Sequence, residues 1–182
     1  MTMNRWHCWE FNVQDKYKSL TVDEVRQDLR ANSHDFAVLM EHWKGDFNIS
    51  TLIRNANAFN AKEVFYLGKK RYDRRGTVGT HHYIDVNFLG TTLADLAKLK
   101  EEYIFVGLDN NIDRCVSMES FQWPKNTLMI FGEEGAGISP EVLDMCDHIV
   151  SITQYGSVRS LNVGTASGIA MYDYLNKEFV SV

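Results

Sequence analysis

The chain has 182 residues, of which 45% are hydrophobic and 24% are charged. This length and composition allow one buried core and exclude a disordered or collagen-like chain. The formal net charge of -5 argues, taken alone, against a polyanion as the partner. No stretch approaches the roughly 20 apolar residues of a membrane span. Residues 1–13 also lack the apolar segment of a secretion signal.

The three cysteines are scattered along the chain, at Cys8, Cys115 and Cys146. Their odd number and the absence of a CxxC spacing support neither a disulfide framework nor a zinc ribbon. We therefore expect reduced thiols, a cytoplasmic location and no metal ion.

Apolar runs and helical spacing alternate along the chain after a polar leader that contains several aromatic residues. Strands are predicted over 36–40, 64–67, 83–86, 103–108, 127–131 and 148–152. Helices are predicted over 48–59, 91–100, 139–146 and 159–176. This alternation predicts an α/β domain with a mainly parallel sheet covered by helices on both faces. We expect residues 1–34 to be an N-terminal extension and residues 35–182 to be that domain.

Three segments carry candidate chemistry, and each follows a predicted strand, where ligands bind in open α/β sheets. In the first, Asn48 opens an amphipathic helix and Arg54 lies close to its apolar face. The alternative for Arg54 is a structural role, as a cap or as the partner of an acid.

The second segment is a glycine-rich loop that contains Gly132, Glu134 and Gly137 and runs into a helix start at Ser139-Pro140. Its glycines allow a backbone to approach a ligand closely. Their order does not match the dinucleotide fingerprint GxGxxG, so a nucleotide-dependent oxidoreductase is rejected. The alternative is a plain turn with a helix cap.

The third segment, 152–168, opens a helix with a high density of small residues. Gly164 and Gly168 should each weaken a helix by about 1 kcal/mol relative to alanine, so something is expected to pack closely against them. Ser160 and Asn162 place a hydroxyl and an amide at the helix start. Simple N-capping explains Ser160 and leaves the small residues unexplained.

A short basic run could attract phosphate although the whole chain is acidic. Between positions 69 and 75 its cations are Lys69, Lys70, Arg71, Arg74 and Arg75, against one acid, Asp73. A solvated charged loop is the alternative. His81 and His82 follow; on a strand, adjacent side chains point to opposite faces, so the two do not form a metal site. A surface or packing role is expected for them, with RNA contact as the alternative.

From about Phe36 to the C-terminus, the three segments resemble in order the three motifs of SPOUT-class, SpoU/TrmH-type RNA ribose methyltransferases. The first motif is asparagine followed six residues later by arginine, as in Asn48 and Arg54. The second is GxExxG, matched by Gly132, Glu134 and Gly137. The third is Ser-Leu-Asn-Val, present as 160–163. Ser50 and Asn60 stand where the family commonly has glycine, and Ile152-Thr153-Gln154 replaces Ile-Pro-Met.

The resemblance implies a C-terminal deep trefoil knot, a homodimer whose substrate cleft is built from both chains, and S-adenosylmethionine as methyl donor. It implies transfer to a ribose 2'-hydroxyl of RNA, with tRNA favoured over ribosomal RNA because no sizeable RNA-binding domain is appended. The implied catalytic residues are Arg54, Glu134, Ser160 and Asn162, and the implied cofactor-binding residues are Leu108, Gly132, Ile152 and Leu161. The expected substrate-binding residues are Asn48, Arg71, Arg74 and Arg75.

Arginine is a poor base, because its side-chain pKa lies above about 12. We therefore expect Arg54 to orient the target phosphate or 2'-oxygen. Glu134 and Asn162 would fix the loop, Arg54 or the substrate, and Ser160 would line the site near the ribose. The competing hypothesis is a non-catalytic RNA-binding or assembly protein that retains the knotted dimer.

Overall fold

The computed structural model describes residues 13–43 and 47–180, with side chains to residue 177. Its strands are β1 (Phe36–His42), β2 (Val64–Gly68), β3 (Val86–Phe88), β4 (Ile104–Leu108), β5 (Val116–Ser117), β6 (Thr127–Phe131) and β7 (His148–Ser151). Its α-helices are α1 (Val22–Ala31), α2 (Asn48–Ala58), α3 (Ala94–Lys98), α4 (Pro140–Leu143) and α5 (Val163–Val180).

The strands form one parallel sheet in the order β3-β2-β1-β6-β4-β7-β5. β1, β2 and β6 are buried along their whole lengths, which agrees with the prediction of a sheet covered on both faces. β7 lies between β4 and β5, which both precede it in the chain, and it leads into α5. This order agrees with the knot that the resemblance implies, and the threading itself stays a prediction.

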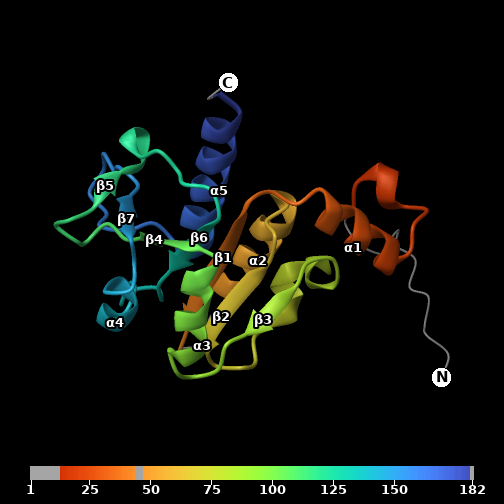
Figure 1. Cartoon of the computed structure of the whole chain (residues 1–182), viewed down its shortest axis with the longest axis horizontal. Helices are drawn as coiled ribbons and strands as arrows, with labels where there is room; N and C mark the ends of the chain where they lie inside the picture. Colours follow the sequence, from red (N-terminus) through yellow and green to blue (C-terminus); the bar gives the residue numbers. More distant parts are fainter. Residues whose placement is uncertain (1–12, 44–46, 181–182) are drawn as a thin grey trace.

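Helices cover both faces of the sheet, as predicted (Figure 1). α2 and α5 pack on one face, where Ile49, Ile53 and Met171 join the core around Phe36 and Phe131. α3 and α4 pack on the other face and contribute Leu96, Val142 and Leu143 to a second apolar cluster. Successive side chains along each central strand therefore pack alternately into two cores, one on each side of the sheet.

The small residues at the start of α5 lie against α2. A Cβ atom added to Gly164 would come within 2.6 Å of Cγ2 of Thr51. The Asn55 side-chain amide donates to the backbone oxygen of Gly164 at 2.8 Å and to the hydroxyl of Ser167 at 3.0 Å. The close packing expected from the glycines is therefore confirmed, and the neighbouring element is α2.

Four element predictions were wrong in detail. The helix expected over 91–100 is α3 (Ala94–Lys98) followed by a 3-10 turn (Leu99–Glu101). The strand expected over 83–86 begins only at Val86. Tyr83 and Ile84, which precede it, are buried although they are not part of the strand, and this explains the apolar pattern. The helix expected to run to Cys146 ends at Leu143. The last helix begins at Val163 and not at Arg159, because Asn162 caps it: its side-chain oxygen accepts from the Thr165 amide at 3.3 Å.

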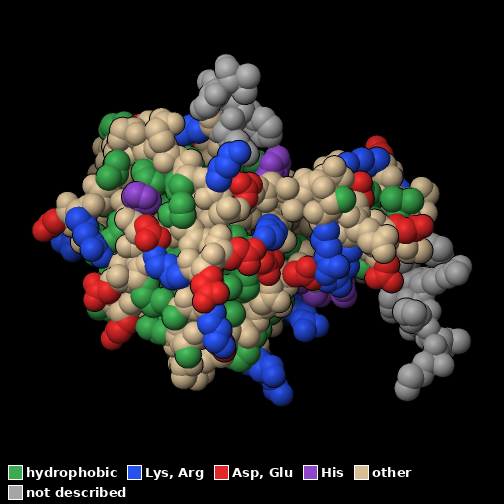
Figure 2. All heavy atoms as spheres, viewed as in Figure 1, with side chains coloured by type: hydrophobic (Ala, Val, Ile, Leu, Met, Phe, Trp, Pro, Cys, Tyr) green, Lys and Arg blue, Asp and Glu red, His purple; other side chains and the backbone are tan. Residues whose placement is uncertain are grey.

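The leader contains a helix, α1, that was not predicted. Residues 1–12 of the leader lie outside the described part of the chain. α1 begins with a capping box in which Thr21 and Glu24 each bond the other's backbone amide. Its Val25 packs with Tyr17 and Tyr83, while Arg26 and Arg30 bond Asp85. α1 projects from the side of the sheet (Figures 1 and 2). In the described ranges, no helix is long and apolar enough to cross a membrane.

Candidate functional site

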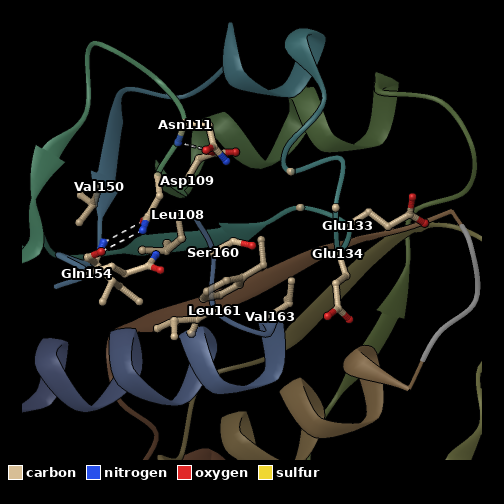
Figure 3. Close-up of a pocket in the computed structure, with 17 residues that line it drawn as sticks. Leu108, Asp109, Asn111, Glu133, Glu134, Val150, Gln154, Ser160, Leu161 and Val163 are labelled. Carbon is tan, nitrogen blue, oxygen red and sulfur yellow. Dashed lines mark hydrogen bonds between the residues drawn. The ribbon is translucent and has the colours of Figure 1, made fainter. Parts of the chain in front are cut away.

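A pocket opens at the carboxyl ends of β4, β6 and β7 (Figure 3). Its apolar wall consists of Leu108, Phe131, Val150, Ile152, Leu161, Val163 and Ala166. Its other lining residues come from the loop after β4, the glycine-rich loop after β6 and the segment that leads into α5: Asp109, Asn110, Asn111, Gly132, Glu133, Glu134, Gly135, Gly137, Gln154 and Ser160. The pocket therefore lies where a parallel α/β sheet places ligands.

The glycine-rich loop folds back on itself directly after β6. Glu133 and Gly137 exchange two backbone hydrogen bonds of 2.9 Å, which close the loop. Gly137 has φ +75°, a conformation that glycine adopts without strain. At Gly132 an added Cβ would lie 1.9 Å from the carbonyl carbon of Gly137, so the strand end and the loop end touch there. The loop is thus more than a plain turn, because it forms one wall of the pocket.

Glu134, Asn48 and Asn162 come from three separate segments and form one hydrogen-bonded cluster. The Asn48 amide donates to Glu134 Oε2 at 2.8 Å, and the Asn162 amide donates to Asn48 Oδ1 at 2.8 Å. The Asn162 amide is also 3.4 Å from Glu134 Oε2. Figure 3 shows the Glu134 side chain directed toward α2, away from that of Glu133. Tertiary structure thus joins residues from all three predicted motifs at one edge of the pocket.

The four residues predicted to bind cofactor, Leu108, Gly132, Ile152 and Leu161, all line the pocket. Ser160 lines it as well, near Leu161 and Val163 (Figure 3). Asn162 lies at the pocket edge through its bonds with Glu134 and Asn48.

Arg54 is not part of the pocket wall. Its side chain is exposed on α2 and forms no hydrogen bond or ion pair with the described residues. Within the described residues, Arg54 therefore neither caps a neighbouring element nor pairs with an acid, which was the structural alternative. Arg54 lies one turn from Thr51, which together with Asn55 and Phe59 lines a second, shallow groove between α2 and α5.

The basic run packs against the first turns of α2. The Ser50 hydroxyl donates to the backbone oxygen of Asp73, and an added Cβ at Gly76 would lie 2.8 Å from Ser50 Cβ. Ser50 is one of the departures from the family pattern. It holds the basic run against α2, at a position two residues after Asn48 in the chain. Arg71, Arg74 and Arg75 are all exposed, although Arg75 bonds the Asp73 carboxylate at 2.9 Å.

Asn60 has φ +49°, the left-handed conformation that asparagine tolerates better than most residues. Its side chain donates to the backbone oxygen of Asn32 at 2.8 Å. This departure from glycine therefore preserves the turn and adds a bond to the residues that follow α1.

His81 and His82 lie in a short 3-10 helix (Thr80–His82), so the expectation that they lie on a strand with opposed side chains was wrong. Their ring centroids are 4.1 Å apart. His81 Nδ1 is 2.6 Å from the hydroxyl of the buried Thr77. Burial, with the neighbouring His82 and Arg74, lowers the pKa of His81 to about 4.

We expect the protein to lose stability between pH 6.5 and about 4, in part through His81. The unfolded chain binds a proton at this histidine through that window while the folded chain does not, so protonation favours unfolding as pH falls. A His81→Gln variant should lose less stability over the window than the wild type, which chemical denaturation at pH 7, 5.5 and 4.5 would measure. Equal losses in both proteins would contradict this role of His81.

Among the lining residues that were not predicted as site residues, three have polar side chains that bear on the pocket: Asp109, Asn110 and Gln154. Asp109 Oδ2 accepts from the Ile138 amide at 3.3 Å, and the Asn110 side chain bonds both the amide and the oxygen of Ile152, at 3.1 and 2.9 Å. These two side chains tie the loop after β4 to the other two pocket loops. The three polar residues Asp109, Asn110 and Asn111, directly after the strand predicted over 103–108, were the sequence signal that could have indicated these site residues.

In the part of the chain that the structure describes, no group of three or more His, Cys, Asp or Glu side chains is placed to hold a metal ion. Cys115 and Cys146 are free thiols, and Cys8 lies outside the described residues. Burial raises the pKa of the Cys146 thiol to about 12, so this sulfur stays protonated and unreactive at neutral pH.

The fold resembles those of known RNA-modifying enzymes. The structure of the TrmH/SpoU tRNA modifying enzyme of A. aeolicus superimposes with a TM-score of 0.76 at 22% identity, covering 87% of this chain and 83% of that one. The SpoU methyltransferase AviRb of Streptomyces viridochromogenes, in complex with AdoMet, gives 0.72 at 25% identity over 84% of this chain and 61% of that one.

Sequence comparison identifies relatives of the same kind. The tRNA (guanosine(18)-2'-O)-methyltransferase of Aquifex aeolicus is 26% identical over 153 residues, 82% of this chain and 72% of the relative. The enzyme of the same description from Escherichia coli K12 is 28% identical over 142 residues, 76% of this chain and 62% of the relative. This chain therefore spans less than two thirds of the Escherichia coli protein.

The parallel sheet, its strand order and the pocket built from three loops define an α/β protein of the SPOUT methyltransferase class. Residues 35–172 match the SpoU rRNA Methylase family. The chain belongs to that family.

Proposed function

We propose that this protein transfers a methyl group from S-adenosylmethionine to a ribose 2'-hydroxyl of tRNA. The observation that carries the proposal is the convergence of Asn48, Glu134 and Asn162 at the edge of a pocket whose wall contains Leu108, Ile152 and other apolar side chains. The names of the relatives support tRNA as substrate and the 2'-oxygen as acceptor. We further propose a cytoplasmic enzyme, with residues 1–34 as an extension of the methyltransferase domain.

The residues of the pocket fit S-adenosylmethionine. The apolar wall suits a flat adenine ring, and the buried Gln154 Oε1 has no hydrogen-bond donor among the described residues, so it can receive one from a ligand. Leu108, Gly132, Ile152 and Leu161 would hold the cofactor, mostly by backbone groups. When bound, the cofactor supplies an electrophilic methyl group.

The residues around the pocket would position the RNA for an in-line attack by its 2'-oxygen. Asn48, Glu134 and Asn162 hold one another, so the glycine-rich loop and the start of α5 are fixed before substrate arrives. Ser160 lies where it can face the ribose. Arg54 would bind the phosphate or the 2'-oxygen, and Arg71, Arg74 and Arg75 would bind flanking phosphates.

A homodimer would complete the site. Arg54 is exposed beside the shallow groove between α2 and α5 and outside the pocket of its own chain. The groove includes the exposed apolar side chains of Ile169 and Tyr172, at 37% and 61% exposure. A second copy seated on this face would bring its own pocket next to Arg54, and RNA would then bind in a cleft formed by both chains.

Methyl transfer to RNA tests the proposal directly. We expect the purified protein to incorporate labelled methyl groups from S-adenosylmethionine into tRNA, with the label on ribose when the RNA is digested and analysed by mass spectrometry. If label appears only in ribosomal RNA, the proposed tRNA substrate is wrong and the proposed ribose methylation still holds. Calorimetry without heat from S-adenosylmethionine, together with RNA binding, would instead identify a non-catalytic RNA-binding protein.

A further inference from the structure

Gln154 has a polar atom for which the pocket supplies no partner. Its Oε1 is buried and receives no hydrogen bond from the described residues, while its Nε2 donates only a long bond of 3.4 Å to the backbone oxygen of Arg159. A buried acceptor without a donor costs about 1–3 kcal/mol, so such atoms usually meet a ligand or an ordered water. Gln154 also lines the pocket, which favours a ligand.

The position of Gln154 identifies the end of the pocket that it serves. Figure 3 shows Gln154 on the same side as Leu108 and Val150, while Glu133 and Glu134 lie on the opposite side. A flat apolar ring fits the side with Leu108 and Val150. The positively charged sulfonium of the cofactor would be favoured on the side with Glu133 and Glu134.

We propose that Gln154 is a specificity-determining residue that accepts a hydrogen bond from the exocyclic amine of the cofactor's adenine ring. The inference rests on the proposed cofactor and adds the side-chain contact that distinguishes a 6-amino purine from a 6-oxo purine. A 6-oxo purine presents an oxygen at that place, and two acceptors would face each other. Turning the amide round to donate would break its contact with Arg159.

The neighbouring bonds keep Gln154 at this position. Asn110 holds both backbone groups of Ile152, and the Thr153 hydroxyl donates to Glu119 Oε2 at 2.9 Å. Both contacts precede Gln154 directly in the chain, so its backbone is fixed on the side of the loop next to β4 and β5. Thr153 and Gln154 replace the Pro-Met of the family pattern. Thr153 anchors the loop through Glu119, and Gln154 binds the adenine ring.

Calorimetric titration with S-adenosylhomocysteine and S-inosylhomocysteine tests the proposal without any RNA or turnover. We expect the wild type to bind the adenosyl compound about tenfold more tightly than the inosyl compound. Gln154→Met, which keeps the length of the side chain and removes the acceptor, should reduce the preference to about twofold or less. Gln154→Glu keeps an acceptor at the same place and should retain the preference for the amino purine.

Gln122→Met is the matched control, because Gln122 is exposed and does not line the pocket. It should bind both compounds as the wild type does. An unchanged preference in Gln154→Met, with the adenosyl compound still bound, would overturn the role of Gln154 and leave the cofactor assignment intact. Binding of neither compound by the wild type would overturn the cofactor assignment and this inference with it.

Discussion

Replacing Gly132 by alanine is expected to abolish tight cofactor binding. The added Cβ would lie 1.9 Å from the carbonyl carbon of Gly137 and 2.2 Å from the Ile138 amide nitrogen, so the glycine-rich loop must move. Backbone atoms cannot yield as a flexible side chain does, and we expect a loss of about 2–3 kcal/mol in stability. The dissociation constant for S-adenosylmethionine should rise at least about tenfold, as calorimetry would measure.

Gly156→Ala is the control for this substitution. Gly156 is exposed, does not line the pocket, and an added Cβ there meets no atom within 4 Å. Its stability and cofactor affinity should match those of the wild type. If Gly132→Ala binds S-adenosylmethionine with unchanged affinity, the loop is not the wall of the cofactor site, and the assignment of this pocket fails.

Substitution of Arg54 by alanine is expected to reduce methyl transfer at least about 100-fold while S-adenosylmethionine still binds. Arg54 lies outside the pocket of its own chain, so the loss should fall on the positioning of RNA and not on the cofactor. Asn162→Ala should also lose activity, because it removes the amide that bonds Asn48 and caps α5. Methyl incorporation and calorimetry together separate the two effects.

Co-expression of these two inactive chains tests whether one site uses both copies. In a mixed dimer, one pocket keeps Asn162 and receives Arg54 from the other chain, so one of its two sites is intact. With random pairing, about one quarter of the wild-type activity should return. If the activity is no higher than that of either variant alone, Arg54 and Asn162 act in the same site of a single chain. The proposal of a cleft formed by both chains is then wrong.

Much of the fold could be predicted because local patterns and long-range packing agree. The apolar runs that begin at Phe36 and Thr127 fit strands buried on both faces, and these two strands are neighbours in the centre of the sheet. The prediction over 83–86 was wrong because burial beside a strand produces the same apolar signal as a strand. α1 was not predicted, although Thr21 and Glu24 show the spacing of a capping box, because the overall polarity of the leader gave no sign of a helix.

The sequence alone determined the α/β class, the three motifs and the residues that could carry chemistry, since strand periodicity and loop composition are local properties of the chain. Only the tertiary structure decided that Asn48, Glu134 and Asn162 bond one another, that Arg54 is exposed and does not line the pocket, and that Gln154 has an unpaired oxygen inside it. Those facts depend on how the ends of distant strands meet and on the direction in which each helix face points. No local pattern specifies either one.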